Sequence, residues 1–103
     1  MSELIELIPR DVPGDEEGLV SYLSQLVEQA KRVAASHANA TLTIRNWLIG
    51  RAINTNILQN TRADYGRQIV ATVSQQLTER FGPGLDRLTV FRMVQFAQLY
   101  PDG

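Results

Sequence analysis

The chain has 103 residues, of which 44% are hydrophobic, and this is enough apolar material for the core of one domain. It contains no cysteine, which excludes disulfides, thiol nucleophiles and thiolate zinc sites. Residues 1–30 hold seven acidic residues and one basic residue, whereas residues 31–103 hold nine basic and four acidic residues. With an acidic N-terminus and no apolar run of about 18 residues, the chain is expected to be cytoplasmic, without membrane contact.

Residues 1–14 are expected to form an N-terminal arm, followed by a helical domain over residues 15–103. Pro9 and the Pro13–Gly14 pair interrupt any regular element in the arm. Four large aliphatic side chains of the arm need an apolar surface on which to dock: Leu4, Ile5, Leu7 and Ile8. Two surfaces meet this need, the domain's own core and a second copy of the chain.

A first helix is predicted from Asp15 to about His37. Asp15 is a suitable N-cap, and Glu16 and Glu17 follow in the first turn, where the helix dipole favours negative charge. Apolar residues repeat at helical spacing along one face: Leu19, Tyr22, Leu23, Leu26, Ala30, Val33 and Ala34. His37 has no second imidazole or thiol nearby, so it is interpreted as a C-terminal cation or a solvated residue and not as a metal ligand.

A second helix is predicted over about residues 40–58. Its apolar side chains lie nearly all round the circumference, which is typical of a central helix, and Trp47 is expected to be buried. Gly50 in the middle of this helix costs about 1 kcal/mol relative to alanine, which predicts close packing against a neighbouring helix. Asn54, Asn56, Asn60 and Thr61 are expected to loosen the end of the segment into a turn.

The third helix, predicted over residues 64–81, is amphipathic. Its apolar stripe consists of Tyr65, Ile69, Val70, Val73, Leu77 and Phe81. Gly82, Pro83 and Gly84 are expected to end it, because proline cannot continue the hydrogen-bond ladder and glycine accepts a left-handed conformation.

The fourth helix is predicted from its N-cap, Asp86, to Tyr100–Pro101. Its core stripe is expected to be Val90, Met93, Val94, Ala97 and Tyr100. Further apolar side chains project from other sides, more than one core uses, and this indicates a partner surface: Leu88, Phe91, Phe96 and Leu99. The expected fold class is all-α, a four-helix domain with a helix-turn-helix-like C-terminal pair and an N-terminal arm.

Several stretches after residue 39 resemble one family in order and spacing. They are residues 46–51 (Asn-Trp-Leu-Ile-Gly-Arg), residues 62–70 (Arg-Ala-Asp-Tyr-Gly-Arg-Gln-Ile-Val), and residues 77–85, 92–96 and 99–101. They resemble the N-terminal domain of YhcG-like bacterial proteins, a family of unknown function whose members usually continue into a PD-(D/E)XK nuclease-like domain. The resemblance implies a nuclease domain as partner, in the same or another chain.

Three positions depart from the family pattern. Asn46 and Leu48 stand where the family more often has tyrosine and glutamate, and Ala97 replaces a common tyrosine. An apolar contact is therefore expected where other members would make a polar one.

The sequence does not contain the nuclease site itself. A PD-(D/E)XK site needs clustered acids for Mg²⁺ and a Glu-x-Lys unit, but Lys31 is the only lysine and Glu28 lies three residues upstream. That spacing is interpreted as a surface pair on a helix. Nucleotide-binding loops, nucleophile elbows and zincin helices are also absent from the sequence. We therefore expect no catalytic residue, no metal and no cofactor.

Nucleic-acid binding is one of two functional hypotheses. The third helix, the Gly-Pro-Gly turn and the fourth helix are similar to a helix-turn-helix, which places DNA-contacting side chains on the last helix: Arg87, Thr89, Arg92 and Gln95. Nine of the ten basic residues are arginine, whose planar fork suits phosphate, carboxylate and interface contacts, although a GC-rich genome also favours arginine.

Protein–protein association is the second hypothesis, and the one that the sequence favours. The chain is expected to form a homodimer, or to dock a nuclease domain, through apolar residues of the arm and the fourth helix: Leu4, Ile5, Ile8, Phe91, Phe96 and Leu99. The acidic and basic regions of two copies would also complement each other.

Overall fold

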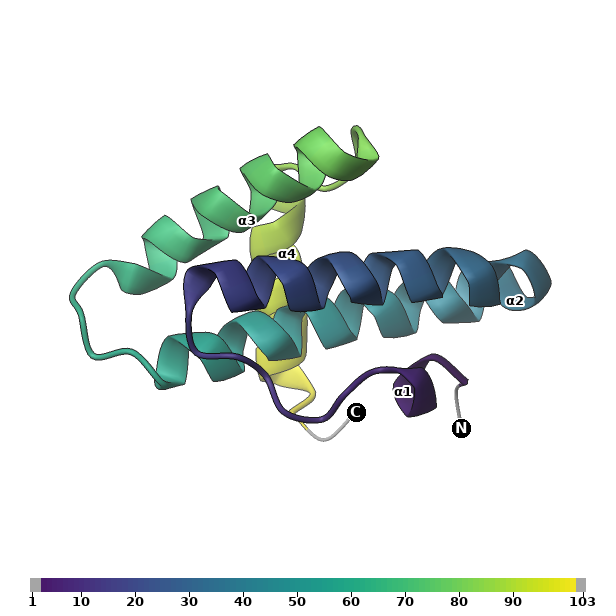
Figure 1. The fold of residues 1–103 in the computed structure, drawn as a ribbon, viewed down its shortest axis with the longest axis horizontal. Coiled ribbons are helices and arrows are strands. Elements are labelled where there is room, and N and C mark those ends of the chain that lie inside the picture. The colour runs from purple at the N-terminus through teal and green to yellow at the C-terminus, as the bar shows by residue number, and fades with distance from the viewer. Residues whose placement is uncertain (1–2, 102–103) are drawn as a thin grey trace.

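The structure is a computed structural model that describes residues 3–101, without the side chains of residues 3 and 35–39. Its elements are α1 (Glu3–Leu7), α2 (Glu16–Leu58), α3 (Tyr65–Phe81) and α4 (Arg87–Leu99) (Figure 1). Residues 3–101 contain no strand, so the predicted all-α class is confirmed. His37 was interpreted as a helix-end or solvated residue, and its side chain lies outside the described part.

The long helix α2 folds back on itself. A straight helix of its 43 residues would be about 64 Å long, whereas the longest dimension of the molecule is 41 Å. Figure 1 shows two antiparallel arms, which we call the first arm (residues 16–34) and the second arm (residues 40–58). They correspond to the two helices predicted for this part of the sequence.

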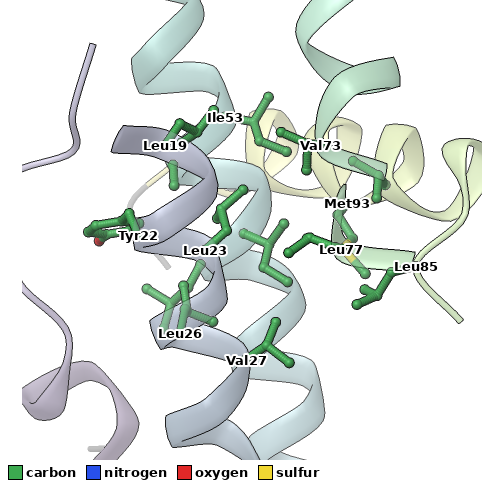
Figure 2. Packing of buried hydrophobic residues seen from close by; sticks show 14 of the residues in the cluster. Leu19, Tyr22, Leu23, Leu26, Val27, Ile53, Val73, Leu77, Leu85 and Met93 are labelled. Carbon is green, nitrogen blue, oxygen red and sulfur yellow. The ribbon is translucent and has the colours of Figure 1, made fainter. Parts of the chain in front are cut away.

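The core forms where the two arms, α3 and α4 meet. Figure 2 shows Leu19, Leu23 and Val27 of the first arm directed towards Ile53 of the second arm and Leu77 of α3. All five side chains are at most 2% exposed. Burial of each large aliphatic side chain contributes about 1.5–3 kcal/mol, so this cluster supplies much of the stability.

Residues 3–14 cover one part of this core. Leu4 and Ile8 are buried against α2, and Ile5 is partly buried. The Tyr22 hydroxyl donates a 2.8 Å hydrogen bond to the carbonyl oxygen of Pro9. The N-terminal arm therefore docks on this chain's own core, which is the first of the two surfaces that the sequence suggested.

The start and end of α2 are joined by a group of residues that we call the closed end: Pro13, Gly14, Asn56, Asn60 and Tyr65. The Asn56 side chain is fully buried and donates to the Pro13 carbonyl at 2.9 Å. Its oxygen accepts a 2.5 Å hydrogen bond from the Tyr65 hydroxyl, and Asn60 donates to Gly14 at 3.2 Å. The predicted turn does follow α2, at residues 59–64. Asn56 and Asn60 themselves do not loosen the chain as expected, because their amides tie three segments together.

Helix α4 crosses the second arm at Gly50. A Cβ atom there would overlap with the Met93 carbonyl group and lie 3.0 Å from the Cβ of Ala97. The predicted close packing at Gly50 is confirmed. The Asn54 amide donates to the Val94 carbonyl at 3.2 Å and fixes the same crossing.

Two predicted core residues lie at the surface or near it. Trp47 is only partly buried; its indole N–H donates to the Tyr100 carbonyl, and the Arg51 guanidinium lies 4.7 Å from the ring centroid. Tyr100 is 57% exposed. The reason is geometric, because α4 crosses α2 at an angle and its last turn extends beyond the arms (Figure 1). Leu58, at the end of α2, is 86% exposed because no other element packs against it.

The turn between α3 and α4 follows the prediction. Gly82 and Gly84 have φ values of +86° and +108°, in the region that favours glycine. Asp86 is the N-cap of α4, as predicted. Lys31, expected to pair with Glu28, instead places its ammonium 4.8 Å from the ring centroid of Phe81, the last residue of α3.

Candidate interaction groove

The exposed side of α4 is unusually apolar. The buried stripe consists of Val90, Met93, Val94 and Ala97, as predicted apart from Tyr100. On other sides of the helix, Leu88, Phe91 and Leu99 are 55%, 48% and 75% exposed. An amphipathic surface helix normally presents polar residues to solvent, so these side chains indicate a candidate interaction surface.

Part of this surface is hollowed into a groove of about 670 Å³. One wall is the start of α3, the other is α4, and the end of the second arm contributes to the lining. The lining residues are Ile57, Gly66, Arg67, Val70, Arg87, Leu88, Phe91, Val94 and Gln98. Gly66 has no side chain to fill the space, and the Gln98 amide is held by the Asn54 side chain at 3.3 Å.

The groove has a positive border. Arg67 and Arg87 line it, Arg92 lies further along the exposed side of α4, and all three are exposed. Within residues 3–101 none of the three makes a hydrogen bond or an ion pair. Residues 65–78 and 87–101 contain these arginines and no acidic residue. The electrostatic field along the groove and the exposed side of α4 therefore attracts anionic groups.

Asp86 is the acidic residue nearest to this surface in the sequence. The Asp86 carboxylate accepts no capping hydrogen bond from the backbone N–H groups of α4. Thr89 is nevertheless close enough to lower the pKa of the Asp86 carboxyl, and the charge of Arg92 lowers it further. Asp86 is thus engaged at the helix start.

The four predicted DNA-contacting residues do not share one face. Because successive helix residues are rotated by about 100°, Arg87 and Thr89 lie about 160° apart around α4. Arg87 lines the groove, whereas Thr89 is half-buried and interacts with Asp86. Arg92 and Gln95 do share the exposed side. The structure therefore brings two of the four together.

The predicted interface residues are also divided. Leu4 and Ile8 are buried in the chain's own core, and α1 contacts α2 alone among the helices. Phe91 lines the groove, while Leu99 lies outside it. Phe96 is half-buried, with its ring edge-on to Tyr100 at a centroid distance of 5.5 Å.

The sequence did not reveal the α3 wall of the groove. Gly66, Arg67 and Val70 look like the ordinary start of an amphipathic helix, and Ile57 looks like a core residue. The one available signal was Gly66 in the first turn of a helix that otherwise carries good helix formers.

Other features of the described residues lie away from the groove. Burial raises the pKa of Tyr22 and Tyr65 and lowers that of Arg45, and all three lie outside the lining. No three His, Cys, Asp or Glu side chains in the described part lie close enough to hold a metal. None of the described helices combines the length and apolar character that a bilayer crossing needs.

The fold and the groove together define an all-α module with an open apolar surface bordered by arginine. A family model, the DUF1016 N-terminal domain, matches residues 22–103. The chain belongs to this family, which is the YhcG-like family whose N-terminal domain it was found to resemble. The match begins at Tyr22, so the N-terminal arm lies outside it. No curated protein and no solved structure matches the chain significantly.

Proposed function

We propose that this chain is a non-catalytic protein–protein association module of a nuclease-family protein in the cytoplasm. It either forms a homodimer or docks a PD-(D/E)XK nuclease domain of the same or another chain. The observation that carries the proposal is the exposure of Leu88, Phe91 and Leu99 on one helix.

The expected energy is consistent with such a role. Leu88 and Phe91 are each about half exposed, so burying the remainder against a partner would contribute about 1 kcal/mol per side chain. Leu99 would add more. A few residues of this kind dominate the free energy of association in protein interfaces, and aromatic residues are enriched among them.

DNA binding is the second candidate, in which the domain brings a PD-(D/E)XK nuclease to nucleic acid. Arg92 and Gln95 on the exposed side of α4 favour it, together with the absence of acidic residues there. Three observations weigh against it. Thr89 is turned away, Leu88 and Leu99 interrupt the polar strip, and residues 82–86 form a longer turn than the three to four residues usual in this motif.

Light scattering tests association directly. We expect the chain to self-associate as its concentration rises to high micromolar, and Leu99→Asp to return it to a monomer because a charge would be buried at the interface. The same samples are titrated with duplex DNA at about 50 mM salt, with Arg92→Ala as the variant and Arg10→Ala as the control. A monomeric chain that binds DNA through Arg92 contradicts the proposal.

A further inference from the structure

We propose that the groove between α3 and α4 binds an acidic amphipathic helix of a partner protein. This inference rests on the proposed association function and names the chemistry of one partner.

The shape suits a helix. From Arg87 to Gln98 the groove follows α4 for about 16 Å, or three helical turns. Its lining is apolar along the middle, with Val70 on α3 and with Leu88, Phe91 and Val94 on α4. A helix of three turns presents apolar side chains at positions i, i+3 or i+4, and i+7, and these would fill such a trough.

The border specifies the charge of that helix. Arg67 belongs to the α3 wall and Arg87 to the α4 wall, so cations stand on both sides of the apolar middle. Neither guanidinium has a hydrogen-bond or ion-pair partner within residues 3–101. Carboxylates flanking the apolar stripe of a partner helix would reach these guanidinium groups and accept paired hydrogen bonds from them.

A second copy of the chain does not fit the groove. A two-fold pair that buried it on both copies would bring the same arginines together without an acidic residue between them. The acidic start of α2 in a second copy could not fill the groove either. Its apolar residues beside Glu16 and Glu17 are already buried in that copy's own core: Leu19, Val20 and Leu23. Leu99, outside the groove, is still accessible for self-association.

Duplex DNA fits the arginines but not the apolar middle of the groove. Phosphates could contact Arg67 and Arg87, yet Leu88 and Phe91 would lie between them against a highly charged backbone. Burial of these side chains would gain little there, whereas a partner helix would cover them with carbon.

The test uses a fluorescein-labelled synthetic peptide that forms a four-turn helix. Leucines occupy one stripe, glutamates flank it, and a matched peptide carries lysines in place of the glutamates. Binding to the 103-residue chain is measured by fluorescence anisotropy. We expect the glutamate peptide to bind at least about tenfold more tightly than the lysine peptide, and the difference to shrink as salt screens the charges.

Variants assign the binding to the groove. Phe91→Ala and Arg87→Glu should each weaken binding of the glutamate peptide about tenfold, whereas Arg87→Lys should retain most of it. Arg32→Glu is the matched control, since Arg32 is exposed on the first arm and outside the lining. Thermal melts of all variants show whether a loss of binding reflects unfolding.

Equal binding of the two peptides, no binding of either, or an equal loss in Arg32→Glu would overturn the inference. If the peptides fail but Leu99-dependent self-association persists, the association function stands and the partner chemistry is wrong. If the peptides fail, the chain stays monomeric and DNA binding requires Arg87, both proposals fail together.

Discussion

Polar and apolar groups are buried or hydrogen-bonded within the chain at the closed end, whereas along the groove they are left exposed. At the closed end Asn56 is fully buried, and its amide and the Tyr65 hydroxyl both have partners. Along the groove Arg67 and Arg87 have none in the described part of the chain, and Phe91 is half exposed. The closed end satisfies its groups internally and serves stability, whereas the groove leaves both kinds of group available to a partner. Mutations should therefore separate into those that unfold the chain and those that change only binding.

The largest expected loss of stability is at the crossing of α4 and the second arm. Gly50→Ala would force a methyl group into the Met93 carbonyl and push α4 away from the second arm. We expect a loss of about 3 kcal/mol in the free energy of unfolding, measured by urea denaturation. Gly66→Ala is the matched control, because its Cβ would lie at ordinary contact distance, 3.5 Å from Ile57. Equal destabilisation by both substitutions would contradict the crossing geometry.

A smaller loss should follow from breaking the closed end. Asn56→Leu leaves the Tyr65 hydroxyl and the Pro13 carbonyl without their partner, which should cost about 2–3 kcal/mol. Tyr65→Phe removes one hydrogen bond and should cost about 1–2 kcal/mol. Denaturation of the double variant measures the coupling between the two residues. Additive losses would show that their hydrogen bond contributes nothing of its own.

Groove substitutions should have little effect on stability. Leu88 is 55% exposed and loses few internal contacts when changed. We expect Leu88→Gln to alter the free energy of unfolding by no more than about 0.5 kcal/mol, while weakening binding of the glutamate peptide. A melting temperature that drops as far as in Asn56→Leu would place Leu88 in the core and remove the contrast between the two regions.

The smallest expected effect concerns pH at the start of α4. Thr89 lowers the pKa of the exposed Asp86 carboxyl in the folded chain, so the charged form stabilises the fold. This contribution is present above the unfolded pKa of about 3.9 and is lost as pH falls through the lower folded value. Asp86→Asn keeps an N-cap side chain but cannot titrate. The melting temperature should therefore fall slightly less steeply for the variant as the pH is lowered from neutral to acidic. Identical dependence of the melting temperature on pH in both chains would exclude this role.

The positions of α2, α3 and α4 follow from the sequence because they depend on spacing within a few residues, whereas the short helix α1 in the N-terminal arm was not predicted. The stripe of α3, the glycine stop at Gly82 and Gly84, and the N-cap Asp86 are all local features, and each lies where it was predicted. The close approach at Gly50 was also predictable, since glycine in a helix interior is unfavourable unless a neighbour needs the space.

Tertiary structure alone decided which side chains those helices cover. Asn56 is buried because the residues before α2 return to its end, and no local pattern encodes that return. Trp47 and Tyr100 stay near the surface because α4 crosses at Gly50 and its last turn runs past the core. The groove exists because the start of α3 and the exposed side of α4 meet beside Ile57. Periodicity determines which face of a helix is apolar, but only the angle and position of a crossing determine how much of that face is buried.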